Sequence, residues 1–158
     1  MKIKYFSISI LLLILLNSCK DERIIISEKW DNGITKEEKK WINKELDSYI
    51  ELTYYENGQI GLEKHYNDGK LNVFKSYYET GEISALVMYH NEVSIFGAEY
   101  YKNGQIMGSV PTNLNGKING TITYFYENGN LRGKQKYLNN KPVGNSKEYD
   151  LNGKLISE

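Results

Sequence analysis

The chain has 158 residues, with 20 basic and 20 acidic side chains, and therefore carries no net charge at neutral pH. This balance argues against a nucleic-acid-binding protein, which needs a basic surface to neutralise phosphates. The single cysteine excludes an internal disulfide framework and any metal site built from several thiolates. Only two histidines, His65 and His90, are present for zinc or triad chemistry, and the sequence identifies no biochemical activity.

The first residues are typical of an export signal. Lys2 and Lys4 precede a mostly apolar run over residues 5–16. This run is too short to cross about 30 Å of hydrocarbon, which needs roughly 20 residues. We therefore interpret residues 1–18 as a signal peptide that does not contribute to the fold.

The signal is followed by the chain's only cysteine. Residues 16–19 read Leu-Asn-Ser-Cys and resemble the bacterial lipobox, in which the cysteine thiol receives a diacylglycerol. We predict that Cys19 is lipidated and anchors the protein to a membrane of the bacterial cell envelope, because two or more acyl chains give stable anchoring. The alternative is an ordinary signal peptide in which Cys19 is incidental.

The residues after Cys19 bear on which side of the envelope the protein faces. Lys20, Asp21 and Glu22 resemble the signal that sends some lipoproteins to the outer cell surface, although a solvated tether explains them equally well. The sequence leaves the cell surface and the periplasm open. We predict that residues 19–29 form a tether, whose three consecutive isoleucines could add an edge strand.

Residues 30–158 contain an internal repeat of 23–25 residues. A glycine recurs at Gly33, Gly58, Gly81, Gly104, Gly129 and Gly153. Asparagine precedes all of these glycines except Gly81, and an aromatic residue lies three positions before the first five, at Trp30, Tyr55, Tyr78, Tyr101 and Tyr126. Such columns are the signature of a repeat architecture, in which neighbouring units stabilise one another.

Each unit is predicted to contain two short strands and two turns. The fold class is therefore all-β, with tandem β-hairpins forming an extended antiparallel meander. Glycine supplies the positive φ that tight hairpin turns need. Between the turns, apolar and polar residues alternate with period two, as in the series Ile83, Ala85, Val87 and Tyr89. Pro111 lacks an amide proton, so its strand is predicted to be irregular.

Residues 35–50 carry a competing helix signal. Residues 35–38 form a capping box, and Ile42, Leu46, Tyr49 and Ile50 follow helical spacing. Trp41 nevertheless occupies an aromatic column of the repeat, and the chain must be extended before Tyr55 to reach the next turn. We favour a degenerate first hairpin over a helix.

The repeat core Tyr-Tyr-x-Asn-Gly-x-Ile, at residues 54–60 and again at 100–106, resembles the MORN repeat variant. Proteins with this repeat are often classed as YwqK-family antitoxins of toxin–antitoxin systems. The resemblance covers residues 30–158 and implies a β-hairpin array that binds a partner protein, with no catalytic set to carry over. The chain departs from the pattern at Thr112, Asp150 and Glu92, where other units have an aromatic residue or glycine.

These features predict a lipid-anchored, non-catalytic module that binds a protein, such as a toxin, in an antitoxin-like or immunity-like role. The alternative is a structural envelope lipoprotein whose aromatic face binds cell-wall glycan. For either role the candidate binding face is the column Tyr55, Tyr78, Tyr101 and Tyr126, although internal stacking is the competing use of these rings. An acid–base pair of Glu63 and His65 is weighed against a solvent-facing polar stripe, which we favour. We expect no cofactor, metal or nucleic acid.

Overall fold

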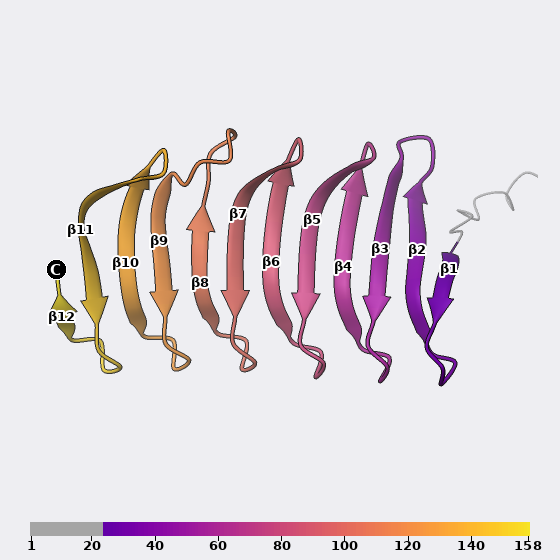
Figure 1. Ribbon diagram of the computed structural model, residues 1–158, viewed down its shortest axis with the longest axis horizontal. Coiled ribbons are helices and arrows are strands. Elements are labelled where there is room, and N and C mark those ends of the chain that lie inside the picture. Colours follow the sequence, from indigo (N-terminus) through magenta and orange to yellow (C-terminus); the bar gives the residue numbers. More distant parts are fainter. Residues whose placement is uncertain (1–23) are drawn as a thin grey trace, which may run out of the picture.

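The computed structural model describes residues 24–158, so the predicted signal peptide and Cys19 lie outside the described residues. The described chain forms a single antiparallel sheet of twelve strands, in which each strand pairs with the next along the sequence (Figure 1). The strands are β1 (Ile24–Lys29), β2 (Thr35–Asn43), β3 (Ser48–Tyr54), β4 (Ile60–Asn67), β5 (Lys70–Tyr77), β6 (Ile83–His90), β7 (Val93–Tyr100), β8 (Ile106–Pro111), β9 (Gly120–Phe125), β10 (Leu131–Leu138), β11 (Lys141–Tyr149) and β12 (Leu155–Ser157). The predicted all-β meander is confirmed.

The segment with the helix signal folds as a hairpin. β2 and β3 pair from Glu37 and Thr53 to Asn43 and Ser48. β3 also pairs with β4 on its other side. An extended conformation lets the segment join the sheet, whereas a helix would leave backbone groups at the edge of β4 without partners. The favoured first hairpin is therefore confirmed, and the capping-box signal was overridden by tertiary pairing.

The array begins before Trp30. The isoleucines at the end of the predicted tether form β1, which pairs with β2 as the edge strand that the sequence left open. No further strand within the described residues covers the outer edge of β1. Ile24, Ile25 and Ile26 are each about half exposed.

Two kinds of turn alternate along the sheet. At one edge, the repeat glycines all have positive φ, from 82° at Gly104 to 101° at Gly81. At the opposite edge, Asp68 and Gly69 have φ of 53° and 67°, and Asn91 and Glu92 have nearly the same values, 48° and 66°. Glu92 therefore keeps the turn although it replaces glycine, in a conformation that side chains with a β-carbon resist.

The irregularity predicted at Pro111 lies between β8 and β9. Their register contains only Gly108 with Tyr124 and Ser109 with Thr123, followed by an isolated bridge from Thr112 to Ile118. Neighbouring pairs of long strands have five or six partners. The missing amide proton of Pro111 and the longer connection after it account for this weak pairing.

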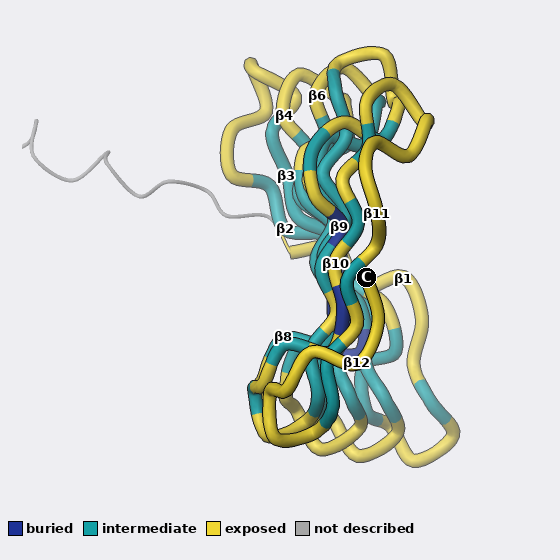
Figure 2. Tube along the Cα trace, turned by 90° about the vertical axis from the view of Figure 1, so that its left-hand side faces the viewer, coloured by how far each residue is buried: buried dark blue, intermediate teal, exposed yellow. Residues whose placement is uncertain are grey.

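The sheet is a single layer (Figure 2). Only Leu52, Ala98 and Ile122 are buried apolar side chains among the described residues. Cross-strand partners put Leu52 and Ala98 on one face, in a row that runs Leu52, Glu63, Lys75, Leu86, Ala98, Ser109, Thr123, Lys134 and Lys147. We call this the Leu52 face, and the opposite surface, which contains Ile122 and Tyr124, the Ile122 face.

Candidate functional site

The predicted tyrosine column connects consecutive units. The hydroxyl groups of its four half-buried tyrosines donate to backbone carbonyl oxygens of the following unit: Tyr55 to Tyr77 at 2.8 Å, Tyr78 to Tyr100 at 2.7 Å, Tyr101 to Phe125 at 2.9 Å, and Tyr126 to Tyr149 at 2.9 Å. The indole of Trp30 makes the equivalent bond to Tyr54 at 3.0 Å. These side chains therefore have a structural use, because each one bonds to the backbone of the following unit.

An asparagine ladder runs beside this column. The sequence shows that asparagine precedes most of the turn glycines, but it did not predict a role for these side chains. The side-chain amides of Asn32, Asn57 and Asn103 donate to the carbonyls of Glu56, Glu79 and Glu127 in the next turn, at 2.8–2.9 Å. Each asparagine also accepts the amide proton two residues on. The ladder explains why asparagine rather than any turn former precedes the glycine.

A second aromatic cluster is also internally satisfied. Trp41, Tyr49 and Tyr66 come from β2, β3 and β4, and the rings of Tyr49 and Tyr66 stack with centroids 4.5 Å apart. The ammonium of Lys39 lies 3.3 Å from the centroid of Tyr49 and 4.2 Å from that of Trp41. Because ring faces bind one another and a cation, this cluster offers little free ring surface to a sugar.

Glu63 and His65 belong to a polar network on the Leu52 face. The Glu63 carboxylate accepts hydrogen bonds from His65, from Tyr77 and, at 3.0 Å, from Lys75. Burial opposes its ionisation, but these donors outweigh burial and lower its pKa to about 2. The same arrangement raises the pKa of Tyr77 through burial and through its bond to the carboxylate. A carboxylate held in this way is a poor proton acceptor, which favours the structural role.

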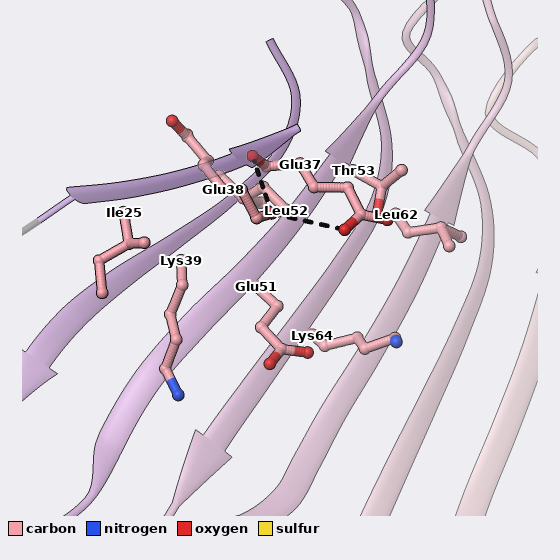
Figure 3. A pocket seen from close by; sticks show the side chains of 10 residues that line it. Ile25, Glu37, Glu38, Lys39, Glu51, Leu52, Thr53, Leu62 and Lys64 are labelled. Atoms are coloured by element: carbon pink, nitrogen blue, oxygen red, sulfur yellow. Dashed lines mark hydrogen bonds between the residues drawn. The ribbon is translucent and has the colours of Figure 1, made fainter. Parts of the chain in front are cut away.

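A pocket of about 320 Å³ lies at the β1 end of the Ile122 face (Figure 3). Lys39, Glu51 and Lys64 are cross-strand neighbours in this pocket, and Figure 3 shows Glu51 and Lys64 side by side. Alternating charges of this kind stabilise neighbouring strands modestly. No group of three or more potential ligands among residues 24–158 could hold a metal ion.

The Leu52 face has an apolar area at the middle of the sheet. It consists of Val73, Leu86, Met88, Phe96 and Pro111 from β5, β6, β7 and β8, and we call it the central patch. Cross-strand pairs join Val73 to Met88, Met88 to Phe96, and Phe96 to Pro111. Met88 is 42% exposed.

Charged residues lie on both sides of the central patch. Glu63 and Lys75 flank it toward β4, while Lys134 and Lys147 follow Ser109 and Thr123 toward β11. An apolar centre with a polar surround is the composition found in protein–protein interfaces. Of the surfaces described above, this patch is the best candidate for binding a protein.

The comparisons with known proteins agree with the repeat. The profile of the MORN repeat variant matches residues 50–68, 70–91, 115–139 and 142–158, together more than half of the chain. No curated protein matches the sequence. The structure contains no helix in residues 24–158 that is long and apolar enough to span a membrane.

Two solved structures share a limited likeness. One is a mutant of TarM from S. aureus in complex with fondaparinux, alpha-GlcNAc-glycerol and UDP, with a TM-score of 0.44 and 9% identity over 63% of this chain. The other is a GtfA/B complex bound to UDP and GlcNAc, with a TM-score of 0.35 and 12% identity over 55% of this chain. The match spans about a fifth of each of those chains, 21% and 22%, and carries no argument about function.

Proposed function

Because the chain belongs to the MORN repeat variant family, we propose that it is a non-catalytic module that binds a partner protein on its open sheet. Each unit contacts only its neighbours, so the array presents a long, continuous surface. The fold does not by itself define an activity, so the side chains on the exposed surface determine what the module can bind.

The central patch supports this proposal. Between Lys75 and Lys134, the row through Leu86 and Ala98 contains no charged side chain. No second layer within the described residues covers this face, so its apolar side chains meet water. Exposed apolar area with a polar rim typically marks a surface for a protein partner.

We further propose that lipid on Cys19 anchors the module in the bacterial cell envelope, on the periplasmic or the cell-surface side. The lipobox resemblance and the short apolar run before it support this anchoring. In an antitoxin-like or immunity-like role, the partner is then a toxin that is exported or arrives from outside, because a cytoplasmic toxin would not meet an exported protein.

Site-specific photocrosslinking of the acylated protein in intact cells tests the protein-binding role. A crosslinking residue in place of Met88 is expected to capture a defined partner, and Met88→Asp together with Phe96→Asp is expected to abolish its copurification. Gln135 lies on the Ile122 face and serves as the control position, where no crosslink to the same partner is expected. Equal capture from both faces contradicts the proposal. Toxicity of the captured protein in cells that lack this chain tests the immunity role.

Metabolic labelling tests the anchor separately. An alkyne fatty acid is expected to label the wild-type protein and not Cys19→Ser, since the thiol is the only acceptor that the lipobox provides. Protease treatment of intact cells then distinguishes the two sides of the envelope. Label on Cys19→Ser contradicts lipidation without affecting the argument for the central patch.

The alternative glycan-binding role is not favoured at the predicted tyrosine column, whose hydroxyl groups bind the neighbouring units. One exposed tyrosine outside that column provides a different place for a sugar.

A further inference from the structure

Tyr124 interrupts the pattern of the repeat. It lies in β9, five residues before the turn glycine Gly129, where other units have the small or acidic residues Thr53, Ser76, Glu99 and Glu148. These positions share one row of the Ile122 face. Tyr124 is the only aromatic residue of this set, and it is 50% exposed. A single exposed aromatic side chain at a repeat position that is otherwise small or acidic points to a role that the other units do not have.

Glycines flank Tyr124 on both neighbouring strands. Its cross-strand partners are Gly108 in β8 and Gly133 in β10, while the equivalent positions of two earlier units hold Leu62 and Ala85. Glycine weakens the interior of a strand and often marks a place where a ligand approaches the backbone closely. Two of them around one exposed ring therefore need an explanation.

Only one of these glycines is explained by internal packing. A β-carbon at Gly108 would lie 3.0 Å from Cδ1 of Tyr124, so the ring rests on Gly108. A β-carbon at Gly133 would have only the carbonyl oxygen of Lys147 within 4 Å, at 3.4 Å. Tyr124 thus rests on Gly108 on one side, and on its other side the floor at Gly133 is buried, with only the Lys147 carbonyl oxygen near the place of a β-carbon.

This floor belongs to a pocket of about 420 Å³, which is within the usual size range of ligand sites. Besides Tyr124 and Gly133, it is lined by Tyr126, Arg132, Glu148, Tyr149 and Ile156. The hydroxyl group of Tyr126 is bonded to the backbone of Tyr149, and the guanidinium of Arg132 lies 5.9 Å from the centroid of the Tyr126 ring. These contacts hold the wall of the pocket in place.

We propose that this pocket binds an uncharged sugar unit of a polysaccharide. The apolar face of a sugar ring can stack on Tyr124, while its hydroxyl groups donate to the Glu148 carboxylate and accept from the Arg132 guanidinium. A purely apolar side chain of a protein would leave both charged groups without partners and would desolvate them at a cost. The positive charge of Arg132 and the negative charge of Glu148 cancel, so the pocket exerts no net attraction on a charged ligand.

The site lies on the opposite face of the sheet from the central patch and does not depend on the proposed protein-binding role. With one sugar ring in contact, we expect a dissociation constant on the order of 1 mM for a single unit. Tight retention on a polysaccharide requires several copies of the protein on one surface.

Binding of chitotetraose, cellotetraose and mannotetraose to the full chain, measured by NMR titration, tests this site. At least one oligosaccharide is expected to bind the wild-type protein, and Tyr124→Ala is expected to weaken that binding at least tenfold. Gly133→Ala is expected to weaken it about fivefold by filling the floor. Gly133 does not have a positive φ, so the variant can fold without backbone strain.

Gly97→Ala is the matched control. Gly97 is also a strand glycine on the Ile122 face, in an open position with nothing within 4 Å of a β-carbon. Gly97 lines a second pocket on the Gly108 side of Tyr124 but not the pocket at Gly133, so binding should equal that of the wild type, and weaker binding by this variant would contradict the proposed site. Absence of binding to all three oligosaccharides overturns the proposal. It is also overturned if the Tyr124→Ala and Gly133→Ala variants bind the oligosaccharide as tightly as the wild-type protein does. Loss of partner-protein capture in these two variants, without sugar binding by the wild type, assigns the pocket to a protein instead.

Discussion

The hydroxyl group of Tyr101 donates a hydrogen bond to the carbonyl oxygen of Phe125, 24 residues later in the chain, at 2.9 Å. Strand pairing alone connects each strand to its immediate neighbours, whereas this bond reaches across the sheet edge from one repeat to the next. The same contact recurs at the other tyrosines of the column. Residues about one repeat period apart in the sequence are therefore in direct contact.

Tyr101→Phe is expected to lower the free energy of unfolding by about 1 kcal/mol, because the ring remains and the Phe125 carbonyl loses its partner. Urea denaturation of the full chain measures the change. Tyr124→Phe is the control, since the structure records no hydrogen bond from the Tyr124 hydroxyl within residues 24–158. A loss of equal size in both variants would contradict the assigned role of the Tyr101 hydroxyl.

Glu92→Gly is expected to stabilise the protein by roughly 0.5–1 kcal/mol. Glu92 has a φ of 66°, the conformation that Gly69 adopts at the equivalent turn, and relief of this strain exceeds the entropy that glycine adds to the unfolded chain. Thermal denaturation measures the gain. Glu99→Gly, near the end of β7 and paired with strands on both sides, is expected to destabilise instead. A lower midpoint for Glu92→Gly would show that this side chain has contacts that compensate for the strain.

Acid is expected to destabilise the wild-type protein through Glu63. Its pKa is about 2 in the folded protein against an ordinary value of 4.5, so the folded state binds this proton more weakly than the unfolded state. The stabilisation is complete above about pH 4.5 and is lost as the pH falls toward 2. Glu63→Gln is expected to flatten this decline, which urea denaturation at pH 6 and pH 3 can detect. Glu56→Gln, at an exposed turn, should leave the decline unchanged.

Deletion of residues 59–81 is expected to preserve the fold. It removes β4 and β5 with their turns and joins Gly58 to Glu82 in frame, so Tyr55 again meets a following unit. Circular dichroism should show a β-sheet spectrum with a lower denaturation midpoint. Deletion of residues 59–70 instead joins two turns at opposite edges and should cause aggregation. Identical unfolding of both variants would contradict the repeat architecture.

Much of the fold could be predicted from the amino-acid pattern. Glycine spacing located the turns, and the alternation of apolar and polar residues located the strands, because both signals arise from local backbone geometry. The structure confirms the meander and the hairpin over residues 35–50, where the helical signal came from a capping box and from side-chain spacing. The edge strand β1 stood as an alternative because an apolar triplet pairs only if a neighbouring edge is available.

The amino-acid order is enough to predict the repeat, its period and the positions that hold each turn. The face that each side chain occupies depends on how the strands pair, because a bulge beside most turns shifts the alternation by one residue. Only the tertiary structure shows that the tyrosine column is used between units and that Tyr124 lies between two glycines of neighbouring strands. Those glycines are 16 and 9 residues from Tyr124 in the sequence, and strand pairing alone brings them together.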